Sequence, residues 1–270
     1  MPHNLPTDGT QKQLHQKNPT FFEFSDPENL EIYTTSSKTM NRPYTFINVA
    51  ITADGKMDTF ERKGSAISSK RDKERVDHLR ADADAVLVGG KTLLGELPKL
   101  TVKSEALRES RVKRGMAPNP IKVGVITNAD IPLESDFIQA GPARVVIFTT
   151  SQTSISHLED LRTHGVEVFV DKLPLVDLQT MMGTLKKIGV QRLMVEGGGT
   201  INFELLRLGL VDELMIYSAP MIFGGDHTPT LASGLGLVRD DAIALKLTNI
   251  ETDEDGGILL NYKLQGVREA

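Results

Sequence analysis

A short run in the last third of the chain combines an acid, three glycines and a hydroxyl: Glu196, Gly197, Gly198, Gly199 and Thr200. The apolar residues before it are typical of a buried strand, and the pattern after it is typical of a helix. Glycines let the backbone turn sharply, so the first N–H groups of such a helix stay free to bind a phosphate or another anion. A tight turn without any ligand explains the same glycines equally well.

Three further polar residues could bind a ligand. Asn48 interrupts a nearly continuous apolar pattern over residues 42–52, and a buried amide needs partners from the core or from a ligand. Asp54 opens an Asp-Gly turn directly after that pattern. Arg80 falls in the last turn of a predicted helix, where a cation complements the helix dipole without any ligand. Each of them therefore has a structural and a functional interpretation.

The predicted helix that carries Arg80 has a recognisable start. Ser69 is a suitable N-cap, and Asp72, three residues later, can return a hydrogen bond to the N–H of the cap. Val76, Leu79 and Ala83 recur at helical spacing and form the inward stripe.

The composition excludes several classes of function. The net charge is −5 and no basic run occurs, which argues against nucleic acid as a partner. The absence of cysteine excludes disulfides, thiolate catalysis and cysteine-type zinc sites. The six histidines do not occur at metal-ligand spacing, so no metal site is expected.

The domain organisation is simple. Residues 1–41 are polar and show no sustained period, so we expect a flexible N-terminal arm, followed by one domain over residues 42–266. No apolar run reaches the length of about 18 residues that a membrane span needs, and no signal peptide is recognisable. The protein is expected to be cytoplasmic, with no membrane partner.

Strand and helix patterns alternate through the middle of the chain, which is typical of βα units and a parallel sheet. Gly165 and Gly189 stand where a left-handed C-terminal cap is expected. The predicted strands are 85–90, 121–127, 143–149, 166–170 and 192–196, and the predicted helices are 157–164, 176–188 and 200–208. The glycine-rich junction at residues 197–199 therefore follows a parallel strand at its carboxyl end, where open α/β sheets bind ligands.

The pattern changes after residue 209. A strand is expected at 213–220, and alternating segments at 243–250 and 258–264 flank an Asp-Gly-Gly turn, which predicts a hairpin. The predicted class is α/β, with a mostly parallel central sheet, helices on both faces and a C-terminal antiparallel hairpin, as in dihydrofolate reductase.

Taken together, the motifs resemble the riboflavin-pathway reductases, in particular the archaeal and fungal 2,5-diamino-6-ribosylamino-4(3H)-pyrimidinone 5′-phosphate reductases. Each motif alone is weak, but eight of them in the same order form a specific signal. They are Arg42-Pro43-Tyr44, Asp54-Gly55-Lys56, Leu79-Arg80-Ala81, Val88-Gly89-Gly90-Lys91-Thr92, Pro98-Lys99-Leu100-Thr101-Val102, Val195-Glu196-Gly197-Gly198-Gly199-Thr200, Gly209-Leu210-Val211-Asp212-Glu213 and Ala219-Pro220-Met221-Ile222-Phe223-Gly224-Gly225.

The resemblance implies a homodimeric enzyme with a dihydrofolate-reductase-like fold. It would use NADPH, or NADH, to reduce the ribosylamino side chain of a phosphorylated pyrimidine to a ribitylamino chain. The sequence alone does not distinguish the two cofactors, because spacing assigns no basic residue to the 2′-phosphate.

The resemblance also assigns residues to roles. Glu96 and Glu196 would be catalytic, although Glu96 stands where the family usually has an aspartate, and Lys103 replaces a commoner arginine. The cofactor-binding residues would be Asp54, Gly89, Thr92, Glu96, Val176, Glu196, Gly197, Gly198, Gly199 and Thr200. The substrate-binding residues would be Asn48, Ser68, Arg80, Leu100 and Lys103, of which Ser68, Arg80 and Lys103 would hold the ribose phosphate.

Asn48 stands where many bacterial members have a lysine. An amide offers both a donor and an acceptor, which favours the diamino pyrimidine over its deaminated form. The alternatives are a reductase for the deaminated pyrimidine, a reductase for a pteridine or folate, and a non-catalytic nucleotide-binding protein.

Overall fold

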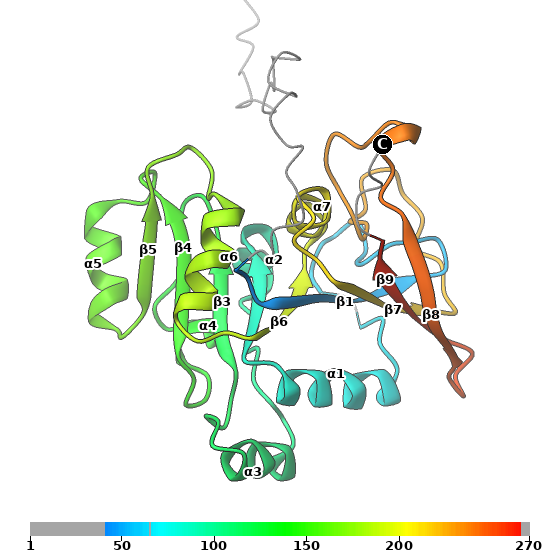
Figure 1. The fold of residues 1–270 in the computed structure, drawn as a ribbon, viewed down its shortest axis with the longest axis horizontal. Coiled ribbons are helices and arrows are strands. Elements are labelled where there is room, and N and C mark those ends of the chain that lie inside the picture. Colours follow the sequence, from blue (N-terminus) through cyan, green and yellow to red (C-terminus); the bar gives the residue numbers. More distant parts are fainter. Residues whose placement is uncertain (1–40, 65, 266–270) are drawn as a thin grey trace, which may run out of the picture. The chain divides into compact units, whose positions relative to one another are not determined.

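The computed structural model describes residues 41–64 and 66–265, which contain one nine-stranded sheet in the order β5-β4-β3-β2-β6-β1-β7-β9-β8 (Figure 1). The strands are β1 (Tyr44–Thr52), β2 (Ala85–Gly89), β3 (Ile121–Val125), β4 (Val145–Thr150), β5 (Glu167–Asp171), β6 (Arg192–Gly197), β7 (Glu213–Ala219), β8 (Leu245–Thr252) and β9 (Ile258–Leu264). The helices are α1 (Lys70–Asp82), α2 (Gly90–Glu96), α3 (Glu105–Lys113), α4 (Asp136–Gln139), α5 (Ile155–Thr163), α6 (Leu178–Lys187) and α7 (Gly199–Arg207), with a 3-10 turn, η2, at Arg239–Asp241.

The sheet confirms the predicted fold class. In the order across the sheet, the first seven strands, from β5 at the edge to β7, pair in parallel. The hairpin of β9 and β8 completes the sheet, and β9 pairs with β7 in the antiparallel direction. The predicted arm, residues 1–41, lies outside the described residues apart from its last position, so its flexibility stays a prediction.

The alternation of side chains along the strands divides the core into two layers. Ile47, Leu87 and Leu193 belong to one buried cluster, together with residues of α6 and α7. Phe46 and Met194, which are next to them in sequence, belong to a second cluster with residues of α2, α4 and α5, against which α1 also packs. Helices therefore cover both faces, because successive side chains of a strand point to opposite sides.

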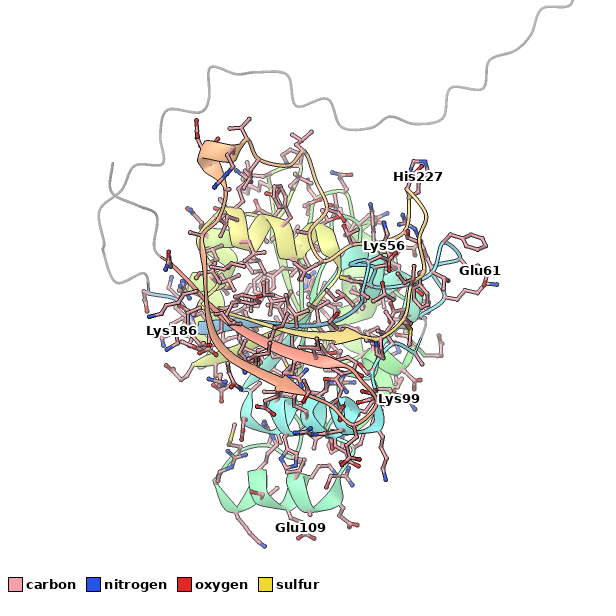
Figure 2. All side chains as sticks on the ribbon, turned by 90° about the vertical axis from the view of Figure 1, so that its right-hand side faces the viewer. Lys56, Glu61, Lys99, Glu109, Lys186 and His227 are labelled. Atoms are coloured by element: carbon pink, nitrogen blue, oxygen red, sulfur yellow. The ribbon has the colours of Figure 1, made fainter. Side chains whose placement is uncertain are left out.

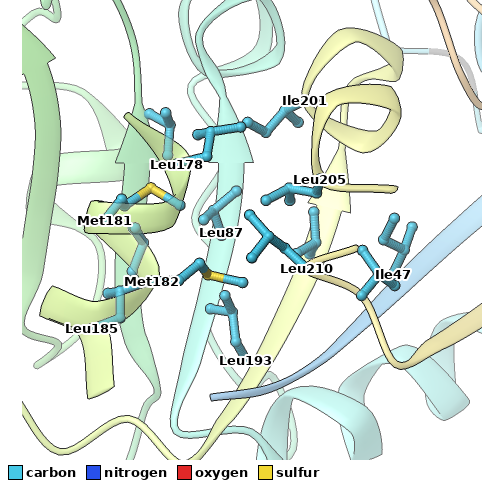
Figure 3. Close-up of a cluster of buried hydrophobic side chains, with 14 of the residues drawn as sticks. Ile47, Leu87, Leu178, Met181, Met182, Leu185, Leu193, Ile201, Leu205 and Leu210 are labelled. Carbon is cyan, nitrogen blue, oxygen red and sulfur yellow. The ribbon is translucent and has the colours of Figure 1, made fainter. Parts of the chain in front are cut away.

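The first layer shows why α6 forms where the sequence predicts a helix. Met181, Met182 and Leu185 are nearly or fully buried and face Leu87 of the sheet, with Leu205 of α7 beside them (Figure 3). Burying one such side chain stabilises the fold by about 1.5–3 kcal/mol. A ten-residue helix is marginal by itself in water, so this packing holds it in place.

The helix ends follow the sequence with one exception. Gly165 and Gly189 have φ values of 77° and 103°, which confirms the predicted left-handed caps. At the start of α1, the Ser69 side chain accepts a hydrogen bond from the Asp72 N–H, as predicted. The predicted return bond from Asp72 is wrong, because its Oδ1 atom instead accepts hydrogen bonds from Arg75 Nε and Nη2 at 3.0 and 2.7 Å.

Charged side chains project from the surface on several elements, for example Lys99, Glu109 on α3 and Lys186 on α6 (Figure 2). No helix among the described residues is long and apolar enough to cross a membrane. Over the same residues, the acids and histidines do not gather into any group of three that could hold a metal ion.

One arginine of α3, Arg111, is buried. Arg111 is 2% exposed, and its Nη1 atom donates to the Ala81 and Ala83 carbonyls at 2.9 and 2.7 Å, while Nε donates to Ala117. It thereby satisfies the last carbonyls of α1, which have no partner within that helix. Residues 101–120 are charged and poor in apolar residues, which predicts surface helix or loop, and this prediction is wrong at Arg111.

We expect Arg111→Met to lower the free energy of unfolding by about 3 kcal/mol, because it leaves the buried Ala83 carbonyl without its donor and removes the contacts to Ala81 and Ala117. Urea denaturation measures this difference. Lys113→Met, at an exposed position of the same helix, is the control and should change stability by less than about 0.5 kcal/mol. Equal effects of both substitutions would contradict the capping role of Arg111.

Candidate active site

A cavity of about 320 Å³ opens beside the carboxyl ends of β1, β2 and β6, three neighbouring parallel strands. Its walls come from these strands, from α1 and α2, and from the loops around residues 57, 66–68, 98 and 103. Seven residues that the sequence assigned to a site line it: Asn48, Ser68, Arg80, Thr92, Glu96, Lys103 and Glu196.

The strand register places two of these residues side by side. Ile47 of β1 pairs with Val195 of β6, so the next residues, Asn48 and Glu196, point to the same face of the sheet. The register of β2 against β6 shifts between Leu87 and Val88, where β6 advances directly from Val195 to Gly197. Glu196 is therefore the additional residue of a bulge, a feature that often redirects a side chain beside an active site.

Glu196 forms a two-pronged ion pair with Arg80. Arg80 Nε and Nη2 donate to the two Glu196 carboxylate oxygens at 2.6 and 2.7 Å, and Nη1 donates to the Thr101 carbonyl at 3.2 Å. The two side chains are only 14% and 16% exposed. This geometry is the strong, directional form of a carboxylate–guanidinium contact. The sequence anticipated a phosphate or the helix dipole as the partner of Arg80, and the structure adds Glu196.

Glu96 is the second acid of the cavity, and it lies in a different environment. Burial of the carboxyl, followed by the negative charges of Asp58 and Glu196, raises the pKa of Glu96. The group nevertheless stays accessible from the cavity. Thr92 lies one helical turn earlier on α2 and lines the same wall. The two carboxylates are thus distinguished by their surroundings, since Glu196 has a cation as partner and Glu96 has acids as neighbours.

Asn48 presents its amide in a fixed direction. Its Oδ1 atom accepts a hydrogen bond from Arg75 Nη2 at 2.7 Å, and Asn48 itself is buried. An arginine can only donate, so the amide offers a ligand chiefly its amino group. The amide oxygen keeps a second lone pair, so recognition of a ligand through both donor and acceptor stays a prediction.

Asp77 and Lys73 line the cavity although sequence reasoning did not select them. The buried Asp77 carboxylate accepts hydrogen bonds from the backbone N–H groups of Lys103 and Ser104 at 2.7 and 2.8 Å. It thereby fixes the loop that carries Lys103 against α1. The available signal was spacing, since Lys73, Asp77 and Arg80 recur at i, i+4 and i+7 and so share one face of the helix.

The glycine-rich turn joins β6 to α7. Gly197 has φ 100°, and the following helix begins at Gly199 without any side-chain cap. The N-terminus of α2 after Gly89 also lacks a side-chain cap, and β2 and β6 are neighbours in the sheet. Two helix N-termini with available N–H groups therefore follow adjacent strands, an arrangement suited to an anion.

Packing explains part of the glycine requirement. A Cβ atom on Gly199 would lie 2.3 Å from the Thr230 carbonyl oxygen, and one on Gly198 would lie 2.9 Å from Thr92 Oγ1. Gly89 is constrained similarly by Ile201 at 2.9 Å. These glycines are needed for close approach within the protein, whether or not a ligand is bound.

Eight predicted site residues do not line the cavity: the four glycines Gly89, Gly197, Gly198 and Gly199, and also Asp54, Leu100, Val176 and Thr200. Leu100 is buried in the core, Val176 packs partly against the other core layer, and Thr200 is exposed in the first turn of α7. The Asp54 carboxylate accepts hydrogen bonds from the Phe223 and Gly224 N–H groups at 3.3 and 2.7 Å, so it holds a neighbouring loop.

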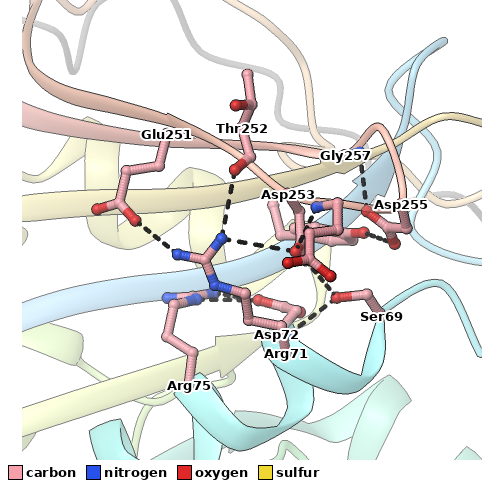
Figure 4. Close-up of polar contacts among 11 residues, drawn as sticks. Ser69, Arg71, Asp72, Arg75, Glu251, Thr252, Asp253, Asp255 and Gly257 are labelled. Carbon is pink, nitrogen blue, oxygen red and sulfur yellow. Dashed lines mark hydrogen bonds and ion pairs between the residues drawn. The ribbon is translucent and has the colours of Figure 1, made fainter.

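The tip of the β8–β9 hairpin supports the cavity from outside (Figure 4). Ser69 Oγ donates to Asp253 at 2.7 Å, and Arg71 pairs with both Asp253 and Glu251. The Tyr217 hydroxyl donates to Asp255 at 2.6 Å, and burial followed by this contact raises the pKa of Tyr217 to about 12. The segment before α1 that contributes cavity residues is therefore tied to the end of the chain.

Comparison with known proteins accounts for this arrangement. The RibD C-terminal domain matches residues 43–259. The chain belongs to the RibD C-terminal domain family. It is 40% identical over 198 residues to the 2,5-diamino-6-ribosylamino-4(3H)-pyrimidinone 5′-phosphate reductase of Archaeoglobus fulgidus, covering 73% of this chain and 90% of that protein. The reductase of the same name from Methanothermobacter thermautotrophicus is 37% identical over 227 residues, covering 83% and 100%.

A solved structure shares the fold of this RibD C-terminal domain. A pyrimidine reductase-like protein from Corynebacterium diphtheriae superimposes with a TM-score of 0.72 at 22% identity, over 87% of this chain and 96% of that one. Family membership makes the chain an oxidoreductase and confirms the resemblance seen in its motifs.

A reductase of this family implies a reduced nicotinamide cofactor, and the residues present fit one. The uncapped N-termini of α2 and α7 suit a pyrophosphate, and Thr92 stands between them beside Gly198. The buried Oδ1 atom of Asn202, in the first turn of α7, has no hydrogen-bond partner among residues 41–64 and 66–265 and lies close to Gly197. A ligand with a hydroxyl or amide donor would satisfy it.

Proposed function

We propose that the protein reduces 2,5-diamino-6-ribosylamino-4(3H)-pyrimidinone 5′-phosphate to the corresponding ribitylamino compound in riboflavin biosynthesis, with NADPH as the cofactor. The names of the two archaeal relatives support the substrate. The observation that carries the proposal is the cavity itself, which is lined by seven residues that the family resemblance assigned to the site and that come from several elements.

The charges of the cavity suit this substrate. Lys103 and Arg80 lie on the wall formed by α1 and its neighbouring loop, while Glu96 and Thr92 lie on α2. A substrate with a phosphate at one end and a reacting sugar carbon near the other matches this division. A pteridine without an acidic side chain would leave the cationic wall without an anionic partner, and a folate would offer it carboxylates in place of a phosphate.

The nicotinamide cofactor supplies a hydride to C1′ of the sugar when it is bound. The protein has to assist the opening of the ribose ring that exposes this carbon. As the bond between C1′ and the ring oxygen breaks, the lone pair of the amino nitrogen forms a C=N bond to C1′, which gives an iminium cation, and the ring oxygen takes up one proton. Glu96 donates that proton, because its raised pKa keeps the carboxyl protonated at higher pH than usual, and water then restores it.

Glu196 contributes in a different way. Its two-pronged contact with Arg80 fixes the side chain at the bulge between the two ligand sites. A fixed negative charge there stabilises the positive charge of the iminium form of the opened sugar. The two acids thus have separate roles, one as proton donor and one as electrostatic partner.

The deaminated pyrimidine is the second candidate substrate. Asn48 directs chiefly its amino group into the cavity, and a donor suits a carbonyl of either compound, including the additional carbonyl that deamination creates. The relatives' names favour the diamino form, and a direct comparison separates the two.

We further propose that the protein forms a homodimer through the β8 edge of its sheet. Every residue of β8 is exposed, including Leu245, Leu247 and Ile250, and Leu235 and Val238 of the preceding loop are exposed as well. A long apolar edge strand is prone to pairing with another chain, and a second copy would cover it.

The first test is turnover. The purified protein should oxidise NADPH when the diamino-ribosylamino-pyrimidinone phosphate is added, as followed by the loss of nicotinamide absorbance. NADH and the deaminated pyrimidine are measured in parallel, which ranks both cofactors and both substrates. No oxidation with either pyrimidine and either cofactor would refute the proposal.

The second test addresses Glu96. Because its raised pKa keeps the proton in place, kcat should be constant below that pKa and fall as the pH rises through it. Glu96→Gln should lower kcat about 100-fold and remove this dependence. Glu96→Asp keeps an acid and is the matched control. An unchanged kcat for the glutamine variant would exclude Glu96 as proton donor.

The third test concerns the β8 edge. Leu247→Glu should shift the mass measured by light scattering from dimer to monomer, because a charge would be buried at the interface. Val112→Glu, at an exposed apolar position on α3, is the control and should leave the mass unchanged. A monomeric wild-type protein would disprove the dimer.

A further inference from the structure

Lys73 lies on the wall of the cavity and has no assigned role. It belongs to the face of α1 that also presents Val76, Asp77 and Arg80 to the cavity. At a rise of about 1.5 Å per residue, Lys73 lies roughly 10 Å along the helix from Arg80 and close to the helix start, which follows Ser68.

The charges lining the cavity differ in whether they have partners. Arg80 and Glu196 neutralise each other, and Asp77 uses both carboxylate oxygens on backbone N–H groups. The side-chain ammonium groups of Lys73 and Lys103 make neither a hydrogen bond nor an ion pair with any residue in the described part of the chain. Two unpaired cations therefore remain for an anionic ligand.

Arg80 is a weaker candidate for a phosphate than its charge alone indicates. Two of its nitrogens bind Glu196, and the third donates to the Thr101 carbonyl. A phosphate that took Arg80 as its principal partner would have to compete with a two-pronged carboxylate contact at 2.6–2.7 Å. The Lys73 ammonium group has no carboxylate partner among the described residues that a phosphate would have to displace.

Asp77 holds the backbone of Lys103 near Lys73. Its carboxylate holds the backbone N–H of Lys103 at 2.7 Å, and Asp77 follows Lys73 by one helical turn on the same face. The Lys103 backbone is therefore anchored about one turn from Lys73, while Ser68 lines the cavity near the start of the same helix.

We propose that Lys73 is a further phosphate-binding residue, which joins Ser68 and Lys103, already expected to hold the ribose phosphate, in binding the 5′-phosphate of the substrate. This assignment deepens the proposed function and rests on it for the identity of the substrate. Two ammonium groups and a hydroxyl on one wall indicate an anionic ligand group such as a phosphate, and the sugar that carries it comes from the proposed function.

A binding experiment tests the assignment without requiring turnover. Calorimetry of the full chain with ribose 5-phosphate, and with ribose as the uncharged counterpart, should show that Lys73→Met weakens binding of the phosphate about tenfold. Lys73→Arg should retain most of the affinity, because it keeps the charge. Lys70→Met is the matched control, since Lys70 precedes Lys73 by one turn of α1, is 93% exposed and lies outside the cavity.

Kinetics provide the readout that a merely structural role would not reproduce. Lys73→Met should raise KM for the phosphorylated pyrimidine about tenfold, with kcat and the KM for the dephosphorylated pyrimidine unchanged. An equal loss with both pyrimidines, or ribose 5-phosphate binding as tight as in wild type, would overturn the role of Lys73. If wild type binds ribose 5-phosphate through Lys73 but oxidises no NADPH, the proposed function fails while the phosphate-binding role of Lys73 stands.

Discussion

The ion pair between Arg80 and Glu196 is the interaction on which the site depends. It joins α1 to the carboxyl end of β6 with two short hydrogen bonds, in a place where both side chains are largely shielded from water. Removing one partner from such a pair leaves an uncompensated charge, so neither residue can change alone without a large cost. The pair fixes the wall of the cavity and leaves the other charged groups free for ligands.

Several contacts from outside the cavity fix α1, the helix that carries Arg80 of this pair. Arg111 binds the carbonyls at the end of α1, immediately after Arg80, and Asp77 ties the loop of Lys103 to the middle of the same helix. The hairpin tip holds the first turn of α1 through Ser69. The helix that carries most of the polar wall is thus fixed at its start, middle and end. Residues fixed in this way can position a ligand before it binds.

The same contacts couple distant parts of the chain. The β8–β9 hairpin contacts α1 at its tip and exposes apolar side chains along its edge strand. A partner on that edge would therefore stabilise the element that supports Ser68 and Ser69. Tyr217 strengthens the connection, because it is buried beside Ile67 and donates a hydrogen bond to Asp255 of the hairpin. The dimer proposed here would thus be linked physically to the cavity.

The sequence by itself determined the fold class, the order of strands and helices, and seven residues of the cavity. These depend on local periodicity, on glycine at turns and on ordered motifs, which are visible in one dimension. Only the tertiary structure decided what the side chains contact. Arg80 binds Glu196, which is 116 positions away in the chain, and Asn48 binds Arg75. The Asp72 carboxylate binds Arg75 instead of the N–H of the predicted cap residue. Lys73 gained significance only when packing showed which cations already have partners, because the pairing of charges is set by distances in space and not by spacing along the chain.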